Sequence, residues 1–356
     1  MATMFGQSLK KDEILARVGH LSQIAGIRMM QLNDGQEFGV RIADVRTGSG
    51  LRVLVSLDRG MDISFAEYRG IPLAWRSPQG DVHPSYYDPR GLGWARSFPG
   101  GLMTGCGMTY LGAPCVDQGE ELGLHGRLSN LPAFDIRSSS RWDGDALTIQ
   151  LEGYVRESTL FKENMLLHRV METRLGESVI TLRDTIRNEG QEPTPLMMLY
   201  HVNLGWPIVD DGSQLLLNTA NTSARDAEAE QGLADAQRCS SPIRNYREQV
   251  FHHNLVVDKE GFAAALLLNR KINLGVYVRF RRKELPRYVE WKMMGESAYV
   301  MGLEPANCGV GGRAKERASG TLQFLDPGEE RHFLVHIGIV EGEKQINDFA
   351  EKNSLR

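Results

Sequence analysis

Alternation of apolar and polar residues is the strongest pattern along the chain. Between Leu51 and Leu57 apolar residues occupy every second position, and the same period of two recurs in many later segments. A period of two buries one face of a strand and leaves the other in water, which is typical of antiparallel sheets. The segments predicted as strands are 38–42, 51–57, 147–153, 180–186, 262–268, 274–280, 288–293, 299–303 and 333–340.

Few segments have the pattern of a helix. Residues 8–18 predict a short amphipathic helix with Ser8 as its N-cap, and residues 343–352 predict a second helix at the C-terminus. Residues 221–238 are charged and indicate a helix or a surface excursion. Residues 76–132 are rich in Gly, Pro and aromatic residues and are predicted to be irregular, and a stretch of this length in a compact domain is usually functional. No linker divides the chain, so one large all-β domain over residues 1–356 is expected.

Composition narrows the class of protein. The chain has 38 glycines where the usual ~7% would give about 25, which indicates many turns between short strands. The net charge is −4, from 45 acidic and 41 basic residues, so nothing favours nucleic acid as a partner. No apolar run is long enough for a membrane span or an export signal, and the four scattered cysteines indicate reduced thiols in the cytoplasm. The composition is also compatible with a homodimer.

Four short segments carry residues suited to chemistry, namely 94–107, 119–127, 195–207 and 302–307. Their candidate side chains lie far apart in the sequence, so only a fold could bring them together. Each also has an ordinary structural explanation. A lone histidine after an apolar run, such as His201, is often a satisfied core group. Glu304 at the end of a strand could mark an exit into solvent, although a carboxylate on an apolar strand is costly to bury without a partner.

These segments resemble the galactose mutarotase (aldose 1-epimerase) superfamily, and closely resemble a bacterial branch of it whose substrate is unassigned. The resemblance rests on the runs GEELGLHGR, YHVNLGWP and GLEPAN, together with DRGMDI and GIPLAW near the first strands, and covers residues 36 to 341 approximately. It implies a β-supersandwich of large, twisted, antiparallel sheets with a few short peripheral helices and a sugar-binding groove on one face. The period-two pattern predicts the same class independently.

The resemblance also implies an activity and a site without metal or organic cofactor. The enzyme would interconvert the anomers of a small carbohydrate by opening and closing its ring, with Glu304 as the base at O1 and His201 as the acid at O5. His125 would polarise the opened carbonyl, and Arg96 would orient the sugar. The other predicted sugar-binding residues are Arg127, Asn203, Trp206 and Trp291.

Departures from the superfamily pattern bear on the substrate. Arg127 replaces a second glycine after His125-Gly126, and the acidic residue that usually binds a ring hydroxyl has no secure match, although residues 248–253 occupy the corresponding region. Free galactose or glucose is therefore a poor match. Arg127 and the glycine-rich loop 309–313 leave room for an anionic sugar, although that loop has a simpler interpretation as a flexible turn.

The sequence is also compatible with two alternative functions. One is a carbohydrate-binding protein that has kept the fold without catalysis, because fold alone does not determine function. The other is a metal-dependent sugar isomerase or epimerase acting at another carbon, with His125, His201, Glu304 and either His252 or His253 as ligands. No HxH or HxxxH spacing supports that ligand set.

Overall fold

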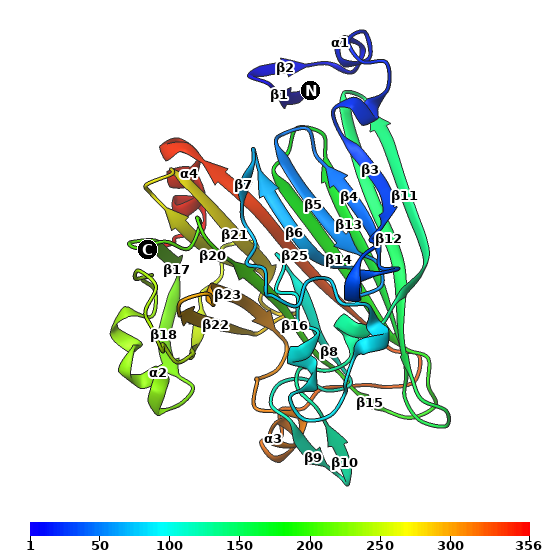
Figure 1. The fold of residues 1–356 in the computed structure, drawn as a ribbon, viewed down its shortest axis with the longest axis vertical. Coiled ribbons are helices and arrows are strands. Elements are labelled where there is room, and N and C mark those ends of the chain that lie inside the picture. The colour runs from blue at the N-terminus through cyan, green and yellow to red at the C-terminus, as the bar shows by residue number, and fades with distance from the viewer.

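The computed structural model describes residues 1–356 and consists mainly of antiparallel strands arranged in three large sheets (Figure 1). The largest sheet has eight strands, in the order β11 (Ala133–Asp143), β12 (Ala146–Ser158), β13 (Asn164–Arg174), β14 (Val179–Asn188), β25 (Glu330–Glu341), β21 (Leu274–Arg281), β20 (Phe262–Asn269) and β17 (Gln214–Leu217). The alternating sequence patterns of its long strands explain it, because β12 and β13 bury every second residue.

A six-stranded sheet forms the second layer. Its order is β18 (Thr219–Ala224), β19 (Gln249–Leu255), β22 (Arg287–Met294), β23 (Tyr299–Ala306), β16 (Met197–Leu204) and β8 (Thr104–Met108). All eight residues of β16 and of β23 are buried, so these two central strands are covered on both faces.

A five-stranded sheet is formed by the first third of the chain. It runs in the order β3 (Gly26–Gln31), β4 (Arg41–Arg46), β5 (Leu51–Ser56), β6 (Asp62–Tyr68) and β7 (Ile71–Pro72). Three small two-stranded ribbons complete the strands: β1 (Ala2–Met4) with β2 (Gln7–Leu9), β9 (Cys115–Asp117) with β10 (Glu120–Leu122), and β15 (Thr194–Pro195) with β24 (Phe324–Leu325). A hydrophobic cluster of 54 buried residues draws on all three large sheets, so one core lies between them.

The helices are short and lie at the periphery in Figure 1. They are α1 (Lys11–Leu15), α2 (Ala227–Gln231), α3 (Arg313–Ala318) and α4 (Gly342–Lys352). None of them is both long and apolar enough to cross a membrane. All four cysteines are free thiols.

The prediction of an all-β, antiparallel fold is confirmed, as are the C-terminal helix and the strands predicted from residue 51 onward outside the irregular stretch. The predicted helix over 8–18 is too long, because Ser8 lies in β2 and Lys10 is the N-cap of the much shorter α1. The strand predicted at 38–42 begins later, at Arg41, and Phe38 is exposed. Residues 221–238 hold one short helix, which Asp226 caps.

The stretch 76–132 is less irregular than predicted, since it contains β8, β9 and β10. The strand β8 has the sequence TGCGM, whose glycines give no alternating pattern. It nevertheless pairs with β16 over Thr104–Met108, so a strand without a sequence signal completes the six-stranded sheet.

A buried ion pair joins the three sheets. Arg169 on β13 lies opposite Asp184 on β14, and its Nη2 donates to Asp184 Oδ2 at 2.6 Å with both side chains fully buried. The hydroxyl of Tyr200 on β16 donates to the same carboxylate at 2.7 Å. Arg169 also lies 3.5 Å from Asp62 on β6, and Asp62 accepts from the backbone N–H of Gly105 on β8. One arginine therefore connects strands of all three layers.

We expect replacement of Arg169 by Met to lower the free energy of unfolding by about 3–5 kcal/mol, because it leaves Asp184 and Asp62 buried without their cation. Urea denaturation measures this loss. The exposed Arg183→Met on the neighbouring strand is the matched control and is expected to change stability by less than ~0.5 kcal/mol. Equal stabilities of the two variants would contradict the structural role of Arg169.

Candidate functional site

The two predicted catalytic side chains lie next to each other on the six-stranded sheet. The register that pairs Leu199 with Ala306 and Val202 with Leu303 places His201 of β16 opposite Glu304 of β23. Their side chains point to the same face, and His201 Nε2 lies 3.2 Å from Glu304 Oε1. Residues far apart in the sequence thus form a cross-strand pair.

The neighbouring strands extend this face. Val289 of β22 pairs with Glu304, and Trp291, two residues further along, pairs with Gly302. A Cβ atom at Gly302 would lie 2.5 Å from Glu304 Oε1 and 2.9 Å from the Cβ of Trp291. Glycine at this position therefore leaves the space that the glutamate and the indole occupy.

His125 reaches the same place from the loop after β10. Its backbone is in the left-handed region, at φ 56°, and its N–H and C=O bond to Gly112 and Gly107, which fixes the loop against β8. Its ring centroid lies 6.0 Å from that of His201 and 4.8 Å from that of Trp94. The two histidines and Glu304 therefore form one cluster.

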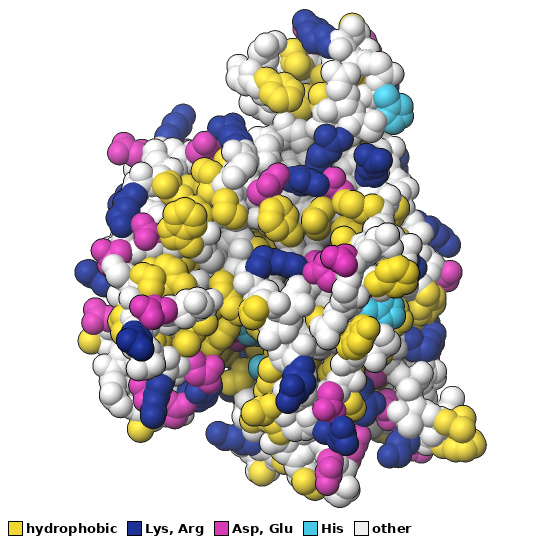
Figure 2. Space-filling view, viewed as in Figure 1, with side chains coloured by type: hydrophobic (Ala, Val, Ile, Leu, Met, Phe, Trp, Pro, Cys, Tyr) yellow, Lys and Arg dark blue, Asp and Glu magenta, His cyan; other side chains and the backbone are white.

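The cluster lies in the wall of a cavity of about 750 Å³. Aromatic rings of Trp75, Trp94, Phe98 and Trp291 line much of it, and its charged residues are Arg225, Glu248, Glu296 and Glu304. Figure 2 shows a hollow on this face of the molecule in which histidine side chains are visible. A volume of this size suits a small organic ligand, and flat aromatic rings suit the apolar face of a sugar. A larger cavity of about 1170 Å³ lies elsewhere; it is lined by none of the eight predicted site residues, although Arg313 of the glycine-rich loop borders it.

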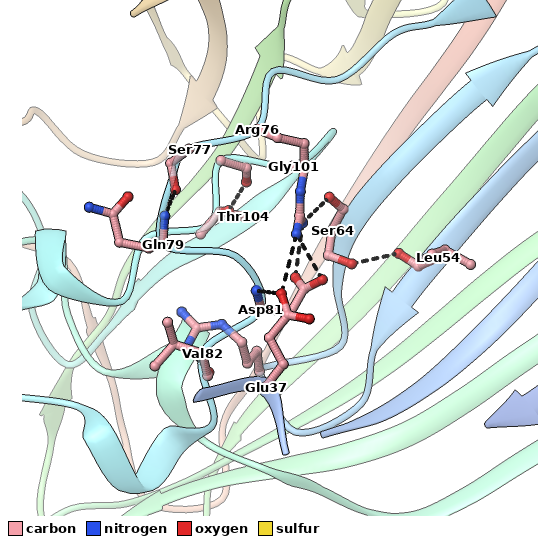
Figure 3. Close-up of polar contacts among 12 residues, drawn as sticks. Glu37, Leu54, Ser64, Arg76, Ser77, Gln79, Asp81, Val82, Gly101 and Thr104 are labelled. Carbon is pink, nitrogen blue, oxygen red and sulfur yellow. Dashed lines mark hydrogen bonds and ion pairs between the residues drawn. The ribbon is translucent and has the colours of Figure 1, made fainter. Parts of the chain in front are cut away.

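The loop that follows β7 supplies one side of the cavity and is fixed by a polar network (Figure 3). Arg76 donates to both oxygens of Asp81 at 3.0 Å and to the carbonyl of Ser64 on β6. The Ser77 hydroxyl donates to the carbonyl of Phe98 and accepts from the N–H of Gln79. The network holds Ser77 and Gln79 at the cavity wall.

Burial shifts the titration of all three members of the cluster. Burial, helped by the nearby carboxylate of Glu248, raises the pKa of Glu304 well above its usual range, against the opposing effect of Arg225. Burial also lowers the pKa of His125 to about 4 and, together with the neighbouring His125, that of His201 to about 3. Burial therefore favours the neutral form of each member of the Glu304–His201 pair, whose facing atoms lie 3.2 Å apart.

Four of the eight predicted site residues, Glu304, His201, His125 and Trp291, line this cavity, and the other four do not. Asn203 is fully buried beneath it, where its side-chain amide donates to the carbonyls of Gly101 and His201 and fixes the strand. Trp206 is 65% exposed, and Arg96 is exposed on a short 3₁₀ turn. The structure gives no support to direct sugar contacts by these residues.

The predicted anion-binding groups have other partners. Arg127 lies 3.8 Å from Glu163 and near the ring of Tyr110 rather than in the cavity wall. Arg313, at the end of the glycine-rich loop, donates to Asp117 and Glu120 at 2.6 Å. The basic residues that suggested an acidic sugar are therefore not placed to hold one at this cluster.

Glu248 and Arg225 are cavity residues that were not assigned from the sequence. Glu248, just before β19, accepts from Trp291 Nε1 at 2.9 Å and from Arg225 at 3.1 Å. Sequence reasoning located the missing acidic residue in the region 248–253 without choosing it, and the cavity contains Glu248. No sequence motif marks Arg225, because it lies in a charged stretch that resembles an ordinary surface segment.

No group of three or more His, Cys, Asp or Glu side chains is arranged to hold a metal ion.

A family model described as a domain of unknown function, DUF4432, matches residues 37–339. The chain belongs to this family. A comparison with curated proteins gives no match. The family match includes the whole His201–Glu304 cluster and all strands of the three large sheets except β3 and the last residues of β25.

Solved structures place this DUF4432 chain among galactose mutarotase-like proteins. A Klebsiella pneumoniae protein provisionally named an aldose 1-epimerase superimposes with a TM-score of 0.88 at 26% identity, over 92% of this chain and 86% of that one. A galactose mutarotase-like protein from Clostridium acetobutylicum has a TM-score of 0.62 at 12% identity, over 90% of this chain and 99% of that one. The predicted superfamily and its sandwich fold are confirmed.

The raised pKa of Glu304 gives a prediction about stability. A carboxyl group whose pKa is higher in the folded than in the unfolded chain stabilises the fold at low pH, and this contribution is lost as the pH rises through the folded value. We therefore expect Glu304→Gln to melt at a higher temperature than the natural chain at about pH 8, by ~2 °C or more, and at a similar temperature at about pH 5. Thermal denaturation at both pH values checks this.

The exposed Glu343→Gln on α4 is the control and is expected to show no such pH-dependent gain. A Glu304→Gln variant that melts below the natural chain at both pH values would show that the carboxyl group stabilises the fold instead.

Proposed function

We propose that this protein is an aldose 1-epimerase-type enzyme that interconverts the two anomers of a sugar. The observation that carries the proposal is the side-by-side arrangement of one carboxyl group and one imidazole, 3.2 Å apart, in the wall of an aromatic cavity. The two oxygens that exchange protons during anomer interconversion, O1 and O5, are bonded to the same carbon. A catalyst for this reaction therefore needs its acceptor and its donor next to each other, as Glu304 and His201 are.

The reaction returns the pair to its starting state in each cycle. With the proton on His201, the Glu304 carboxylate removes the proton of the O1 hydroxyl while His201 protonates O5, and the C1–O5 bond breaks. After rotation about C1–C2, O5 attacks the other face of the carbonyl. His201 takes the O5 proton back, and O1 recovers its proton from Glu304. The number of protons held by the pair is unchanged, and no redox step occurs.

Burial shifts the pKa values of Glu304 and His201 in the directions that favour this proton transfer. A carboxylate with a raised pKa is a stronger base towards a hydroxyl, and an imidazolium with a lowered pKa is a stronger acid towards a ring oxygen. Burial favours the form with the proton on Glu304, and transfer of this proton to His201, 3.2 Å away, gives the carboxylate and the imidazolium that act on the closed ring. His125, kept neutral by burial, can donate to the carbonyl oxygen of the open form.

Glu248 is the residue best placed to accept from a ring hydroxyl. Its carboxylate lies at the cavity wall between the indole N–H of Trp291 and the guanidinium of Arg225, which fix its position. Carboxylates bind sugar hydroxyls by charge-assisted hydrogen bonds. This role fills the position that the sequence left unassigned.

We expect Glu304→Gln and His201→Ala each to reduce catalysed anomer exchange by about 10²–10⁴-fold, because each removes one partner of the proton transfer. Saturation-transfer NMR over a panel of monosaccharides measures the exchange. The exposed residues Glu343 and His332 provide matched controls, since Glu343→Gln and His332→Ala change the same residue types far from the cavity.

Absence of exchange above buffer for every sugar with the natural chain would overturn the proposal. Sugar binding without turnover, unaffected by Glu304→Gln, would instead identify a carbohydrate-binding protein.

A further inference from the structure

A second polar cavity, of about 490 Å³, adjoins the candidate active site. Its lining residues come from three strands of the same sheet and from the segments around them: Asn221, Ser223, His252, His253, Asn254, Arg282, Pro286, Arg287, Tyr288, Asn307, Thr321 and Gln323. None of them belongs to the proposed acid–base machinery.

Strand register places the two cavities one after the other along one face of the sheet. Val250 and Val289 line the first cavity, and the residues two positions along the same strands, His252 and Arg287, line the second. Residues two apart in a strand share a face and lie about 6.6 Å apart. The second cavity therefore begins within a few ångströms of the first, towards the other end of the strands.

The charges of the two cavities differ in sign. Three glutamates line the first cavity, and its one arginine, Arg225, is already paired with Asp226 at 2.6 Å and with Glu248. The second cavity is lined by Arg282 and Arg287 and by no carboxylate, although Glu316 lies 3.7 Å from Arg287. An anionic group is therefore favoured at the second cavity over the first.

Hydrogen-bond donors are available in the second cavity. Arg287 has one ionic contact, with Glu316 at 3.7 Å, which is too long for a hydrogen bond. Arg282 uses Nη2 on Asn254 and Nε on the carbonyl of Pro286, so its Nη1 has no partner. Tyr288, the residue after Arg287 on β22, points to the opposite face of the strand and packs against Phe280 in the core, so its hydroxyl is not a donor to this cavity.

The subsite does not rely on either histidine. His253 bonds through both ring nitrogens, to Thr222 and to Glu290 at 2.8 Å, and its side chain shares the opposite face of the sheet with Tyr288. Burial lowers the pKa of His252, and the neighbouring His253 and the cations of Arg287, Arg225 and Lys315 lower it further. Several cations thus converge on the space beside His252.

We propose that the second cavity is an anion-binding subsite, in which Arg287 and Arg282 hold a phosphate, sulfate or carboxylate group. Guanidinium groups recognise such oxyanions by paired, charge-assisted hydrogen bonds. The group belongs either to a sugar whose ring occupies the first cavity or to a separate small anion. The proposal concerns binding, so it holds whether or not the first cavity catalyses anomer exchange.

Titration calorimetry of the full chain with inorganic phosphate tests the subsite. We expect Arg287→Gln and Arg282→Gln each to weaken phosphate binding by about tenfold to a hundredfold, since each removes a charged donor. Arg270→Gln, an exposed change elsewhere on the surface, is the matched control and is expected to bind as the natural chain does. Absence of phosphate binding to the natural chain, or unchanged binding in both subsite variants, would overturn the proposal.

The source of the anion is identified by a competition experiment. If the anion is part of the sugar, a hexose phosphate is expected to bind more tightly than the free hexose and to be displaced by phosphate, and Arg287→Gln removes that advantage. If the anion is separate, phosphate and a neutral sugar are expected to bind together. Both readouts report binding, so they are independent of any loss of exchange in Glu304→Gln.

Discussion

The arrangement of the molecule depends on the buried guanidinium of Arg169. It neutralises Asp184 at 2.6 Å, lies 3.5 Å from Asp62 and donates to the carbonyl of Gly60, all without access to water. Charges buried in this way are tolerated only when they are paired and hydrogen-bonded, so the strands that supply them have little freedom to shift. Tyr200 joins the same network from β16, and the next residue on that strand is His201. The Arg169–Asp184 ion pair therefore helps to fix the part of β16 that carries the His201 imidazole.

The candidate site lowers the stability of the folded protein. A carboxyl group and two imidazoles are buried with nitrogen and oxygen atoms that have no hydrogen-bond partner: His125 Nδ1, His201 Nδ1 and Glu304 Oε1. Unpaired polar atoms of this kind reduce stability, and they concentrate where a ligand supplies the missing partners. The surrounding polar networks, including Arg76 with Asp81, hold the wall of the cavity in place without the ligand. The wall of the site is thus fixed by contacts within the protein.

Sequence reasoning predicted the parts of the fold that have a local signal. Alternation identified strands such as β5, β12, β14 and β25, because burial on one face imposes a period of two, but it missed the long strands β11 and β13. It could not identify β8, since the glycines of TGCGM carry no side chains to alternate, and it extended the helix of residues 8–18 past its real ends. Strand positions and the class of fold were therefore accessible, whereas the pairing of β8 with β16 depends on contacts distant in sequence.

The residues of the candidate site also divide into those that the sequence indicated and those that only the fold reveals. Resemblance to a family singled out His201, Glu304 and His125, and the structure brings them together. Arg96 and Trp206 failed to reach the cavity because sequence proximity to a motif does not determine the direction of a side chain. Glu248 and Arg225 reach it from segments without a motif, and only the sheet register places them beside Trp291.

The central claim is that Glu304 and His201 serve the two oxygens of one anomeric carbon. A crystal structure of the Glu304→Gln variant with a bound sugar tests it most directly. We expect the anomeric carbon to lie over the pair, with O1 within hydrogen-bond distance of residue 304 and O5 within hydrogen-bond distance of His201. A sugar bound elsewhere, or bound in this cavity with its anomeric carbon turned away from both side chains, would contradict it.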